Sequence, residues 1–591
     1  MTTYTAPLRD TQFLFDEVFD VYETYKHLPA VTDINSEFVN SVLEEAGKFA
    51  SQEVHPINYS GDKEGCRWDN GKVTVPKEYR EVHEKYVEGG WTQLSENTEF
   101  GGQGLPRILS GALLEFWMGA SPAFAIYSSR DGSIAAIERN ATQALKNKYL
   151  PNLVNGSWVG TMAMTEPHCG SDLGLLRTKA ESQSDGSYKI TGTKIFITGG
   201  ESDLADNTIH LVLARIPGSP EGIKGISLFV LPKYLINDDG TLGEENNVYC
   251  SSIEHKMGLN ASATCTMNFE ASRGWLIGDV DKGMRAMFAM VNQSRFLVGV
   301  QATGLSEVAY QNAAAYARDR IQMRSLTGAQ NPGAAADPII VHPDVRRMLL
   351  SQRAFAEGSR ALNTYIGVLF DQQEHSKDET SRIRAGHLLG LLTPICKGFG
   401  SEMGTENTNL ALQCFGGHGF IAETGVEQFV RDMRITQLYE GTTGIQGLDL
   451  LARKVLGSQG ATLKILTDEI AEFCAEHADV EALQMFISPL AELKEQWQQL
   501  SAKVGMAAME KTADELGSAA VDYLMFSGYV TLAYMWAKMA KAALGKDQAF
   551  YQTKLQTAQF YYQRILPRTQ LHAQVMLSGA EYLMNMRADD F

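Results

Sequence analysis

Cysteine is scarce in this chain of 591 residues, which contains seven of them. The number is odd and no pair has the C-x-x-C spacing, so neither a disulfide framework nor a zinc site is indicated. The chain also lacks an uninterrupted apolar stretch approaching the roughly 18–20 residues that span a bilayer. Its first ten residues lack the basic start and apolar run of a secretory signal. We therefore expect a cytoplasmic protein without metal.

Basic residues are outnumbered, because 52 Lys and Arg stand against 70 Asp and Glu, for a net charge of −18. A general nucleic-acid surface needs clustered Lys and Arg to neutralise phosphates, so that class of function is disfavoured. The content of 44% hydrophobic and 21% charged residues is ordinary for a globular protein. A chain of this length exceeds one hydrophobic core, and three or four packed units are expected.

The hydrophobic pattern changes along the chain in the order helical, β, helical, helical. Apolar residues first recur every three or four positions, then give way to short segments rich in β-branched and aromatic residues, and then return to helical spacing. A hinge of glycine and polar residues at 457–460 precedes the last helical part. The predicted fold is α+β, with an N-terminal helical domain (1–155), a middle β-barrel domain (156–279), a second helical-bundle domain (280–456) and a C-terminal all-helical extension (461–591).

Several elements are predicted within these parts. A long helix should begin at Lys282 and run to Arg320, and a Gly/Ala/Pro-rich loop should follow at 325–338. The strands of the β-domain are expected at 157–164, 188–198, 209–216, 226–231 and 264–269.

Four short motifs could carry chemistry, although each has an ordinary structural explanation. Met-Thr-Glu-Pro-His-Cys-Gly-Ser-Asp (164–172) follows a predicted strand and exposes backbone N–H groups and hydroxyls, but could be a plain turn. Lys-Ile-Phe-Ile-Thr-Gly-Gly (194–200) ends a strand, and its Phe196 could belong to the core. Tyr-Ala-Arg-Asp-Arg (316–320) could simply complement a helix dipole. Gln-Cys-Phe-Gly-Gly-His-Gly-Phe (413–420) permits close backbone approach, but is not a G-x-G-x-x-G fingerprint.

The fifth motif is Tyr-Glu-Gly-Thr-Thr-Gly-Ile-Gln (439–446). A single glutamate between helices is usually a solvated surface residue. With the other four motifs in this order and spacing, however, residues 60–456 resemble the acyl-CoA dehydrogenase family. The extra residues at both ends resemble its long-form branch, which includes 3-methylmercaptopropionyl-CoA dehydrogenases and some bacterial fatty acyl-CoA dehydrogenases.

The resemblance implies that the β-domain and the second helical domain hold FAD between them. Phe196 and Thr198 match an aromatic residue, commonly Trp, and a hydroxyl that contact the flavin ring. Arg320 matches an arginine that reaches the FAD pyrophosphate, typically that of a neighbouring subunit. Gly444 stands where many relatives have Gln, so that contact is not carried over. The remaining cofactor positions implied are Met162, Met164, Thr165, Gly170, Ser171, Gln413, Gly416, Gly417 and Thr442.

The resemblance also implies that Glu440 is the base that removes the α-proton of an acyl-CoA thioester. A branch of the family places its base on the long helix, but Ser294 occupies that position here and cannot act as a carboxylate. Substrate contacts are implied for Ser171, Arg295, Glu440 and Gly441. The product would be a trans-2-enoyl-CoA, with FAD as electron acceptor and an electron-transferring flavoprotein as its oxidant.

Three other functions stay open at this point. The substrate could be a straight-chain fatty acyl-CoA rather than 3-methylmercaptopropionyl-CoA. The enzyme could be an acyl-CoA oxidase that passes electrons to oxygen, since the motifs barely separate the two classes. An inactive scaffold is the third alternative, disfavoured because Glu440 and the flavin contacts are present.

The C-terminal extension has 11 basic and 16 acidic residues, a net of −5. This charge argues against the branch of the family that associates with DNA through a basic C-terminal region. The Met, Trp and Tyr residues at 534–539 could touch a membrane, but a buried helix face is the commoner explanation. We expect the extension to pack over the second helical domain and to favour a homodimer.

Overall fold

The computed structural model describes residues 2–32, 34–128 and 131–591, with backbone alone at 128, 131 and 288–290. The chain divides into two compact units. The sheet unit comprises Gln52–Pro106 and Ser121–Ser294, and the helical unit comprises Met1–Ser51, Arg107–Ala120 and Arg295–Phe591. Within the described residues, no helix has both the length and the apolar composition needed to cross a bilayer.

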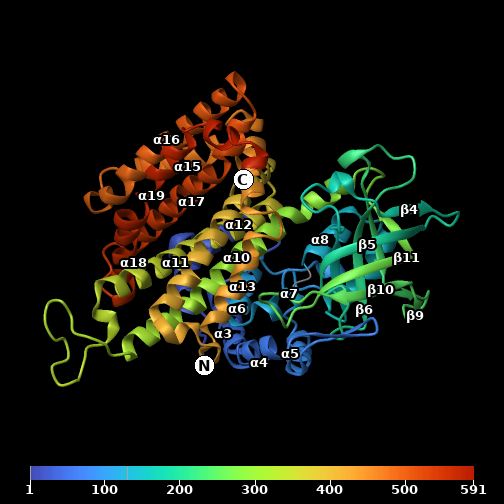
Figure 1. Ribbon diagram of the computed structural model, residues 1–591, viewed down its shortest axis with the longest axis horizontal. Helices are drawn as coiled ribbons and strands as arrows, with labels where there is room; N and C mark the ends of the chain where they lie inside the picture. The colour runs from blue at the N-terminus through green and yellow to red at the C-terminus, as the bar shows by residue number, and fades with distance from the viewer. Residues whose placement is uncertain (1, 33, 129–130) are drawn as a thin grey trace. The chain divides into compact units, whose positions relative to one another are not determined.

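The sheet unit is built on seven strands in the order β3-β6-β7-β11-β5-β4, with β10 also paired to β11 (Figure 1). Two further links curl this sheet back on itself, as in a barrel. A bridge joins Lys179 to Arg215, and the Ile195 N–H donates to the Thr165 carbonyl at 2.9 Å. The strands are β1 (Arg67–Asp69), β2 (Lys72–Thr74), β3 (Trp158–Ala163), β4 (Lys179–Ser182), β5 (Tyr188–Thr198), β6 (Asn207–Ala214), β7 (Ser227–Pro232), β8 (Tyr234–Ile236), β9 (Leu242–Glu245), β10 (Val248–Ile253) and β11 (Thr264–Ile277).

Helices flank this sheet and share its core. Leu150 and Leu153 of one helix pack in the same buried cluster as Leu211 and Val230 of the sheet. Strands β6 and β7 are buried at every position, because both of their faces are covered. The helices wholly within this unit are α4 (Pro56–Glu64), α5 (Lys77–Glu88), α7 (Pro122–Ser128), α8 (Asp131–Asn140) and α9 (Gln143–Val154).

The helical unit is a bundle in which the long helices α11 and α12 pack side by side (Figure 1). The helix α10 begins in the sheet unit and continues into this bundle. The helices are α1 (Leu8–Phe13), α2 (Val21–Tyr25), α3 (Ser36–Phe49), α6 (Arg107–Ala120), α10 (Gly283–Asp319), α11 (Pro343–His375), α12 (Glu379–Phe415), α13 (Val426–Arg434), α14 (Thr443–Leu448), α15 (Ala461–Glu476), α16 (Gln484–Glu510), α17 (Asp514–Ala543), α18 (Ala549–Phe560), α19 (Arg568–Met576) and α20 (Glu581–Met584).

The C-terminal extension packs against α11 and α12 through helix α17. The Trp536 indole donates to the Ala354 carbonyl at 3.1 Å, and Tyr529 meets Phe399 edge to face at 5.0 Å. Gly528 permits this approach, because a Cβ there would lie 2.1 Å from Phe399. The aromatic and sulfur side chains at 534–536 are buried. The expectation of a buried helix face is therefore confirmed over that of a membrane contact.

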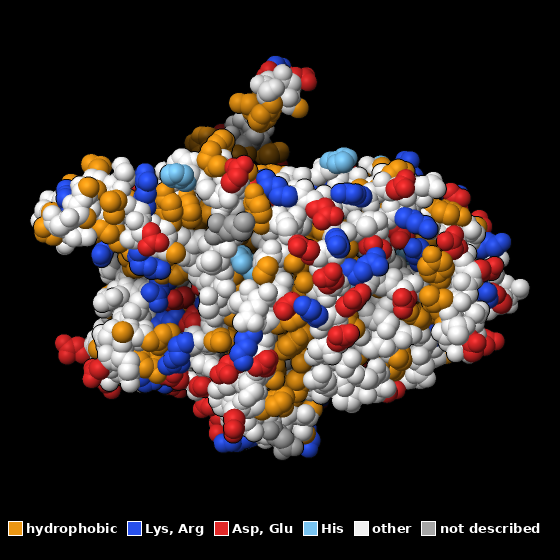
Figure 2. Space-filling model, turned by 90° about the horizontal axis from the view of Figure 1, so that it is seen from below, with side chains coloured by type: hydrophobic (Ala, Val, Ile, Leu, Met, Phe, Trp, Pro, Cys, Tyr) orange, Lys and Arg blue, Asp and Glu red, His pale blue; other side chains and the backbone are white. Residues whose placement is uncertain are grey.

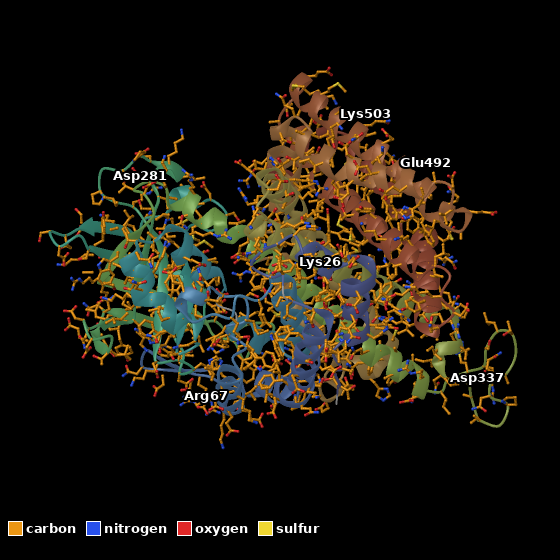
Figure 3. All side chains as sticks on the ribbon, turned by 180° about the vertical axis from the view of Figure 1, so that it is seen from behind. Lys26, Arg67, Asp281, Asp337, Glu492 and Lys503 are labelled. Atoms are coloured by element: carbon orange, nitrogen blue, oxygen red, sulfur yellow. The ribbon has the colours of Figure 1, made fainter. Side chains whose placement is uncertain are left out.

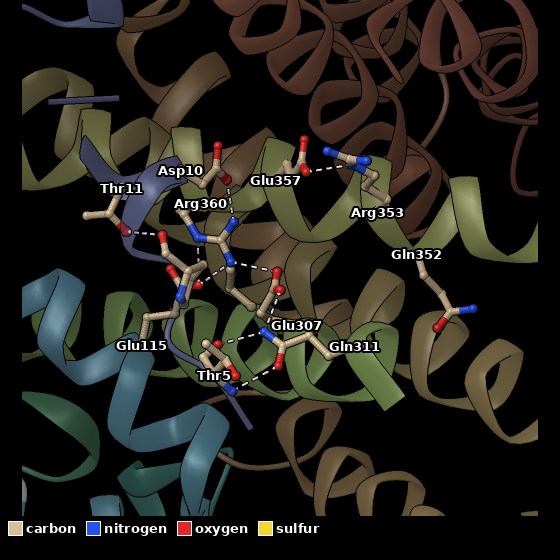
Figure 4. A network of polar contacts seen from close by, with 12 residues as sticks. Thr5, Asp10, Thr11, Glu115, Glu307, Gln311, Gln352, Arg353, Glu357 and Arg360 are labelled. Atoms are coloured by element: carbon tan, nitrogen blue, oxygen red, sulfur yellow. Dashed lines mark hydrogen bonds and ion pairs between the residues drawn. The ribbon is translucent and has the colours of Figure 1, made fainter. Parts of the chain in front are cut away.

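A buried ionic cluster, the Arg360 network, ties the helical unit together (Figure 4). The Arg360 guanidinium donates to Asp10 of α1 at 2.5 Å, to Glu115 of α6 at 2.8 Å and to Glu307 of α10 at 2.8 Å. Lys554 of α18 donates to the same Asp10. Burial nevertheless raises the pKa of the Glu115 carboxyl to about 7. Arg360 and Lys554 thus meet at the carboxylate of Asp10, which joins the two ends of the chain.

The predicted loop between α10 and α11 projects from the helices, with Asp337 on it (Figure 3). The Asp337 carboxylate accepts backbone N–H groups from Ser325 at 3.0 Å and Asn331 at 2.7 Å. These hydrogen bonds, led by the one from Ser325, lower the pKa of Asp337 to about 2. The Asp337 carboxylate therefore holds the loop together through hydrogen bonds to its own backbone.

The N-terminal part is mainly helical, as expected, and contains one short hairpin of β1 and β2. Two expectations about the β-domain need correction. Strand β11 extends beyond residue 269 to Ile277, and the short strands β4, β8, β9 and β10 were not expected. On the face shown in Figure 2, acidic and basic side chains are interspersed.

Candidate active site

The predicted base Glu440 lies on a short loop of the helical unit, between a 3₁₀ turn that ends at Gln437 and the start of α14. Glu440 has a φ of 56°, in the left-handed region that side chains other than glycine rarely adopt. Gly441 follows with a φ of 87°. Thr442 then caps α14, since its hydroxyl accepts the Ile445 N–H at 3.5 Å. Two successive left-handed residues turn the chain sharply at Glu440.

Two buried side chains hold the carbonyl groups of this turn. The Gln446 amide donates to the Glu440 carbonyl at 3.0 Å and to the Gly441 carbonyl at 3.2 Å. The Lys397 ammonium, from the middle of α12, donates to the Gly441 carbonyl at 2.6 Å. Both side chains are fully buried. The orientation of the Glu440–Gly441 peptide is therefore fixed from two helices.

Glu440 is half-buried, and the charges of two cations act on its carboxyl. Burial raises the pKa of Glu440 above its ordinary value, while Lys397 and Arg295 act in the opposite direction. Burial lowers the pKa of the Lys397 ammonium to about 8, opposed by Glu440. A desolvated carboxylate is a stronger base than an exposed one, which suits proton abstraction.

Arg295 is itself paired, and so its charge is partly compensated. It is 6% exposed and donates to Asp449 at 2.5 Å. The Tyr439 hydroxyl donates to Gln301 of α10. Burial, followed by the charge of Glu440, raises the pKa of Tyr439. Within the described chain, three buried polar atoms near this loop have no hydrogen-bond partner: Arg295 Nε, Gln301 Nε2 and Gln446 Oε1.

A second group of predicted residues gathers at one corner of the helical unit. Tyr316, in the last turn of α10, stacks on Phe415 at 4.2 Å and hydrogen-bonds His418 at 2.9 Å. These contacts bring the end of α10 beside the end of α12. The predicted cofactor residues Arg320, Gln413, Gly416 and Gly417 are all exposed on these two ends. Nothing lies within 4 Å of a Cβ built on either glycine, so a ligand could approach the backbone closely.

The predicted flavin-ring contacts are at strand ends of the sheet unit. Phe196 stands on a β-bulge, where Cys265 pairs with Ile197 but Met267 pairs with Lys194. The bulge gives Phe196 a φ of 61° and leaves its ring 60% exposed, and Thr198 beyond it is also exposed.

The first predicted motif follows β3. Met162 and Met164 are half-buried and pack against the core of the sheet unit. Thr165 is also half-buried, and Gly170 and Ser171 are exposed.

Glu166 holds this motif in place. Its carboxylate accepts the Lys194 ammonium at 2.9 Å, the Thr178 hydroxyl at 2.6 Å and the Arg177 N–H at 2.7 Å. Ligand atoms of Glu166, His168 and Cys169 lie within 4.8 Å of one another. The Glu166 oxygens are already engaged by these donors, so the group does not support a metal site.

Lys397 and Gln446 were missed at the sequence level as functional residues. The signal for Lys397 was a single charge within the buried run Leu391–Gly400, since lysine is almost never buried without a specific partner. Gln446 ended a motif that was already noted, but no sequence rule predicts its bond to Glu440.

Four family models match successive parts of the chain. These are the acyl-CoA dehydrogenase N-terminal domain (37–157), middle domain (161–272) and C-terminal domain (281–456), and the acetyl-CoA dehydrogenase C-terminal-like model (466–587). Together they cover most of its length. The chain belongs to the acyl-CoA dehydrogenase family. It is accordingly an FAD-dependent oxidoreductase.

Relatives in this family extend over almost the whole chain. The 3-methylmercaptopropionyl-CoA dehydrogenase of Ruegeria pomeroyi is 41% identical over 95% of this chain and 96% of its own. A broad-specificity linear acyl-CoA dehydrogenase of Mycobacterium tuberculosis is 33% identical over 96% of each. The solved acyl-CoA dehydrogenase of Bacillus anthracis, complexed with FAD, has the same fold, with a TM-score of 0.75, 23% identity and coverage of 99% and 93%.

Each unit has residues that fit part of a flavin dinucleotide. In the sheet unit the exposed ring of Phe196 offers an aromatic face. In the helical unit the open backbone at Gly416 and Gly417 suits a pyrophosphate. The unpaired Gln301 Nε2 supplies a buried donor for a polar ligand. When bound, FAD supplies the two-electron acceptor that protein side chains lack.

Proposed function

We propose that Glu440 removes the α-proton of an acyl-CoA thioester, and that the product is a trans-2-enoyl-CoA. The observation that carries this proposal is a half-buried glutamate whose carboxyl has a raised pKa, on a turn that Lys397 and Gln446 hold through its carbonyl groups. An α-proton of a thioester is weakly acidic, so its removal needs a desolvated base and stabilisation of the enolate-like transition state. We assign that stabilisation to the Glu440 backbone N–H and a ribityl hydroxyl of the cofactor.

The other predicted residues take supporting roles in this proposal. Ser171, Arg295 and Gly441 contact the acyl-CoA. Phe196, Thr198 and Thr442 contact the flavin ring, and Arg320 reaches an FAD pyrophosphate, typically that of a neighbouring subunit. The cofactor positions Met162, Met164, Thr165, Gly170, Ser171, Gln413, Gly416 and Gly417 complete the set. The division of the chain at 155, 279 and 456 into four functional parts belongs to the same proposal.

For the substrate, we propose 3-methylmercaptopropionyl-CoA. The support is the 41% identical relative of that name, which matches this chain nearly end to end. The alternative is a straight-chain acyl-CoA, supported by the 33% identical relative described as acting on linear acyl-CoA. The electron acceptor in the proposal is an electron-transferring flavoprotein.

We also propose a homodimer, formed through the corner that carries Arg320. Large apolar side chains are exposed there, with Met323 at 76%, Leu326 at 88% and Phe420 at 84%. Monomeric proteins rarely expose such a cluster, and burying it against a second copy would remove it from water. Light scattering of the purified holoenzyme tests this, and a monomer or a tetramer would contradict it.

The decisive experiment follows the flavin absorbance of the purified holoenzyme under anaerobic conditions. We expect 3-methylmercaptopropionyl-CoA to bleach the flavin faster than butyryl-CoA or octanoyl-CoA, and Glu440→Gln to abolish bleaching by all three. The variant should retain its flavin, because Gln is nearly isosteric with Glu. Bleaching that survives in Glu440→Gln would refute the assignment of the base.

Oxygen use separates a dehydrogenase from an oxidase. With a dye acceptor the wild type should turn over at least about tenfold faster than with oxygen alone, a difference of about 1.4 kcal/mol in barrier. Equal rates would instead support an acyl-CoA oxidase.

A further inference from the structure

Lys397 is a fully buried cation whose hydrogen bond is made to the turn that carries Glu440. It lies in the middle of α12, is 0% exposed and has Cys396, Gly398 and Phe399 as buried neighbours in the chain. Removing an ammonium group from water is costly unless it is paired and hydrogen-bonded. Its recorded hydrogen bond is to the Gly441 carbonyl at 2.6 Å, and the carboxylate that most affects it is Glu440. This lysine is thus directed at the turn that carries the proposed base.

Gln446 holds the same turn from the other side. It donates to the carbonyls of both Glu440 and Gly441. A Cβ at Gly441 would lie 2.7 Å from the Gln446 amide nitrogen, so the contact requires glycine there. The left-handed backbone of Glu440 is unfavourable for a residue with a side chain and persists only when its surroundings impose it. Lys397 and Gln446 supply that constraint.

We propose that Lys397 and Gln446 are positioning residues that form a clamp on the Glu440–Gly441 carbonyls, and that Lys397 also keeps the Glu440 carboxylate ionised for proton abstraction. This inference rests on the proposed function of Glu440. It separates two roles, because Gln446 acts through geometry alone while Lys397 adds a charge.

The charges that surround Glu440 make Lys397 the more influential cation. Arg295, from α10, is already paired with Asp449 at 2.5 Å. The Tyr439 hydroxyl is neutral and bonded to Gln301. On the far side of Lys397, Glu402 accepts the Gln437 amide and the Thr443 hydroxyl, each at 2.5 Å. Burial lowers the pKa of the Lys454 ammonium, which lies in the turn after α14. Asp449 opposes this shift and Arg295 adds to it.

The sign of the pH effect follows from these charges. Burial raises the pKa of Glu440 and Lys397 lowers it, so removing the ammonium raises that pKa further. Less of the base is then ionised at neutral pH. Lys397 has a pKa of about 8 and loses its own charge above that pH. The advantage that Lys397 gives is therefore present below about pH 8 and fades above it.

The test compares Lys397→Met and Gln446→Leu with the wild-type holoenzyme from pH 5 to 10. Two quantities are measured: kcat/KM for 3-methylmercaptopropionyl-CoA, and solvent deuterium exchange at the α-carbon of a 3-thiaacyl-CoA, which has no β-hydrogen to transfer. For Lys397→Met we expect the acidic limb of both profiles to move up by about one pH unit, which is a loss of about tenfold at pH values on that limb. The profiles should converge with those of the wild type above pH 8.

For Gln446→Leu we expect a lower kcat at every pH, with the acidic limb unmoved. Lys397→Arg should restore the wild-type limb, because it keeps the charge. Lys464→Met, which removes an exposed lysine paired with Asp468, is the matched control and should leave both profiles unchanged. Flavin content and thermal unfolding of each variant establish that it is folded and loaded, and Lys397→Gln replaces Lys397→Met if the latter does not fold.

Two results would overturn the inference: an unmoved acidic limb in Lys397→Met, or a loss of the same factor at every pH. Failure of the proposed function looks different, because the wild type itself would then neither exchange the α-proton nor bleach its flavin.

Discussion

Two residues with side chains adopt left-handed backbone conformations at positions proposed to meet the reactants. They are Glu440, with a φ of 56°, and Phe196, with a φ of 61°. Each costs on the order of 1–2 kcal/mol relative to a relaxed backbone. In both cases the strained backbone sets the direction of one functional side chain: a base on a turn in one unit, and an aromatic ring on a bulge in the other.

Replacing Phe196 with glycine should separate strain from function. Relief of the left-handed strain is offset by the flexibility of glycine, so the free energy of unfolding of the apoprotein should change by less than about 1 kcal/mol. Loss of the ring should weaken FAD binding about tenfold, or roughly 1.4 kcal/mol. Fluorescence titration with FAD measures the affinity. Unchanged affinity would remove Phe196 from the proposed flavin contacts.

The sequence was informative about residues that belong to a motif and silent about residues that act across the fold. Glu440 was found because its neighbours form a recognisable string. Lys397 precedes it by 43 positions and reaches Gly441 only because α12 places it there. Periodicity shows that a lysine will be buried, but not which carbonyl will accept a hydrogen bond from it.

At the scale of elements, Glu166 organises the segment between β3 and β4. Its carboxylate joins Lys194 of β5 to the backbone at Arg177 and Thr178, and all of these bonds lie within the sheet unit. The segment bears Thr165, Gly170 and Ser171, so the predicted cofactor positions depend on this buried ion pair for their placement.

Glu166→Ala should leave Lys194 buried without its partner carboxylate. Breaking a buried pair in this way typically costs about 3–5 kcal/mol. We expect a loss of that size in the free energy of unfolding of the sheet unit, together with faster hydrogen exchange over residues 165–178. The exposed Glu181→Ala on β4 is the control and should cost less than about 0.5 kcal/mol. Slow exchange in Glu166→Ala would mean that other contacts hold the segment.

Strands with a strong apolar pattern could be predicted, and short polar ones could not. The prediction for β5 agrees with the structure at both ends, since most of its residues are β-branched or aromatic. The prediction for β11 ended eight residues early, because Ala271 takes a φ of 55° at a register shift and interrupts the alternation. Strands β8 and β9 are nearly devoid of buried residues, which removes the signal that such predictions use.

At the scale of the whole chain, the Arg360 network connects segments that are remote in sequence. Arg360→Met would leave Asp10, Glu115 and Glu307 together in the interior of the helical unit. We expect the free energy of unfolding of this unit to fall by about 3–5 kcal/mol in urea denaturation. Arg347→Met removes an exposed ion pair on the same helix and should cost less than about 1 kcal/mol. Equal losses in the two variants would contradict a special role for the network.

The contact between Asp10 and Lys554 joins residues 544 positions apart. During synthesis, α1 leaves the ribosome long before Lys554, the lysine that pairs with its Asp10, has been made. At about 5–20 residues per second, that interval is roughly half a minute to two minutes. Until then Asp10 can pair with Arg360, which is made earlier, but not with Lys554. The ion-paired interior of the helical unit can therefore be completed only when translation is nearly finished.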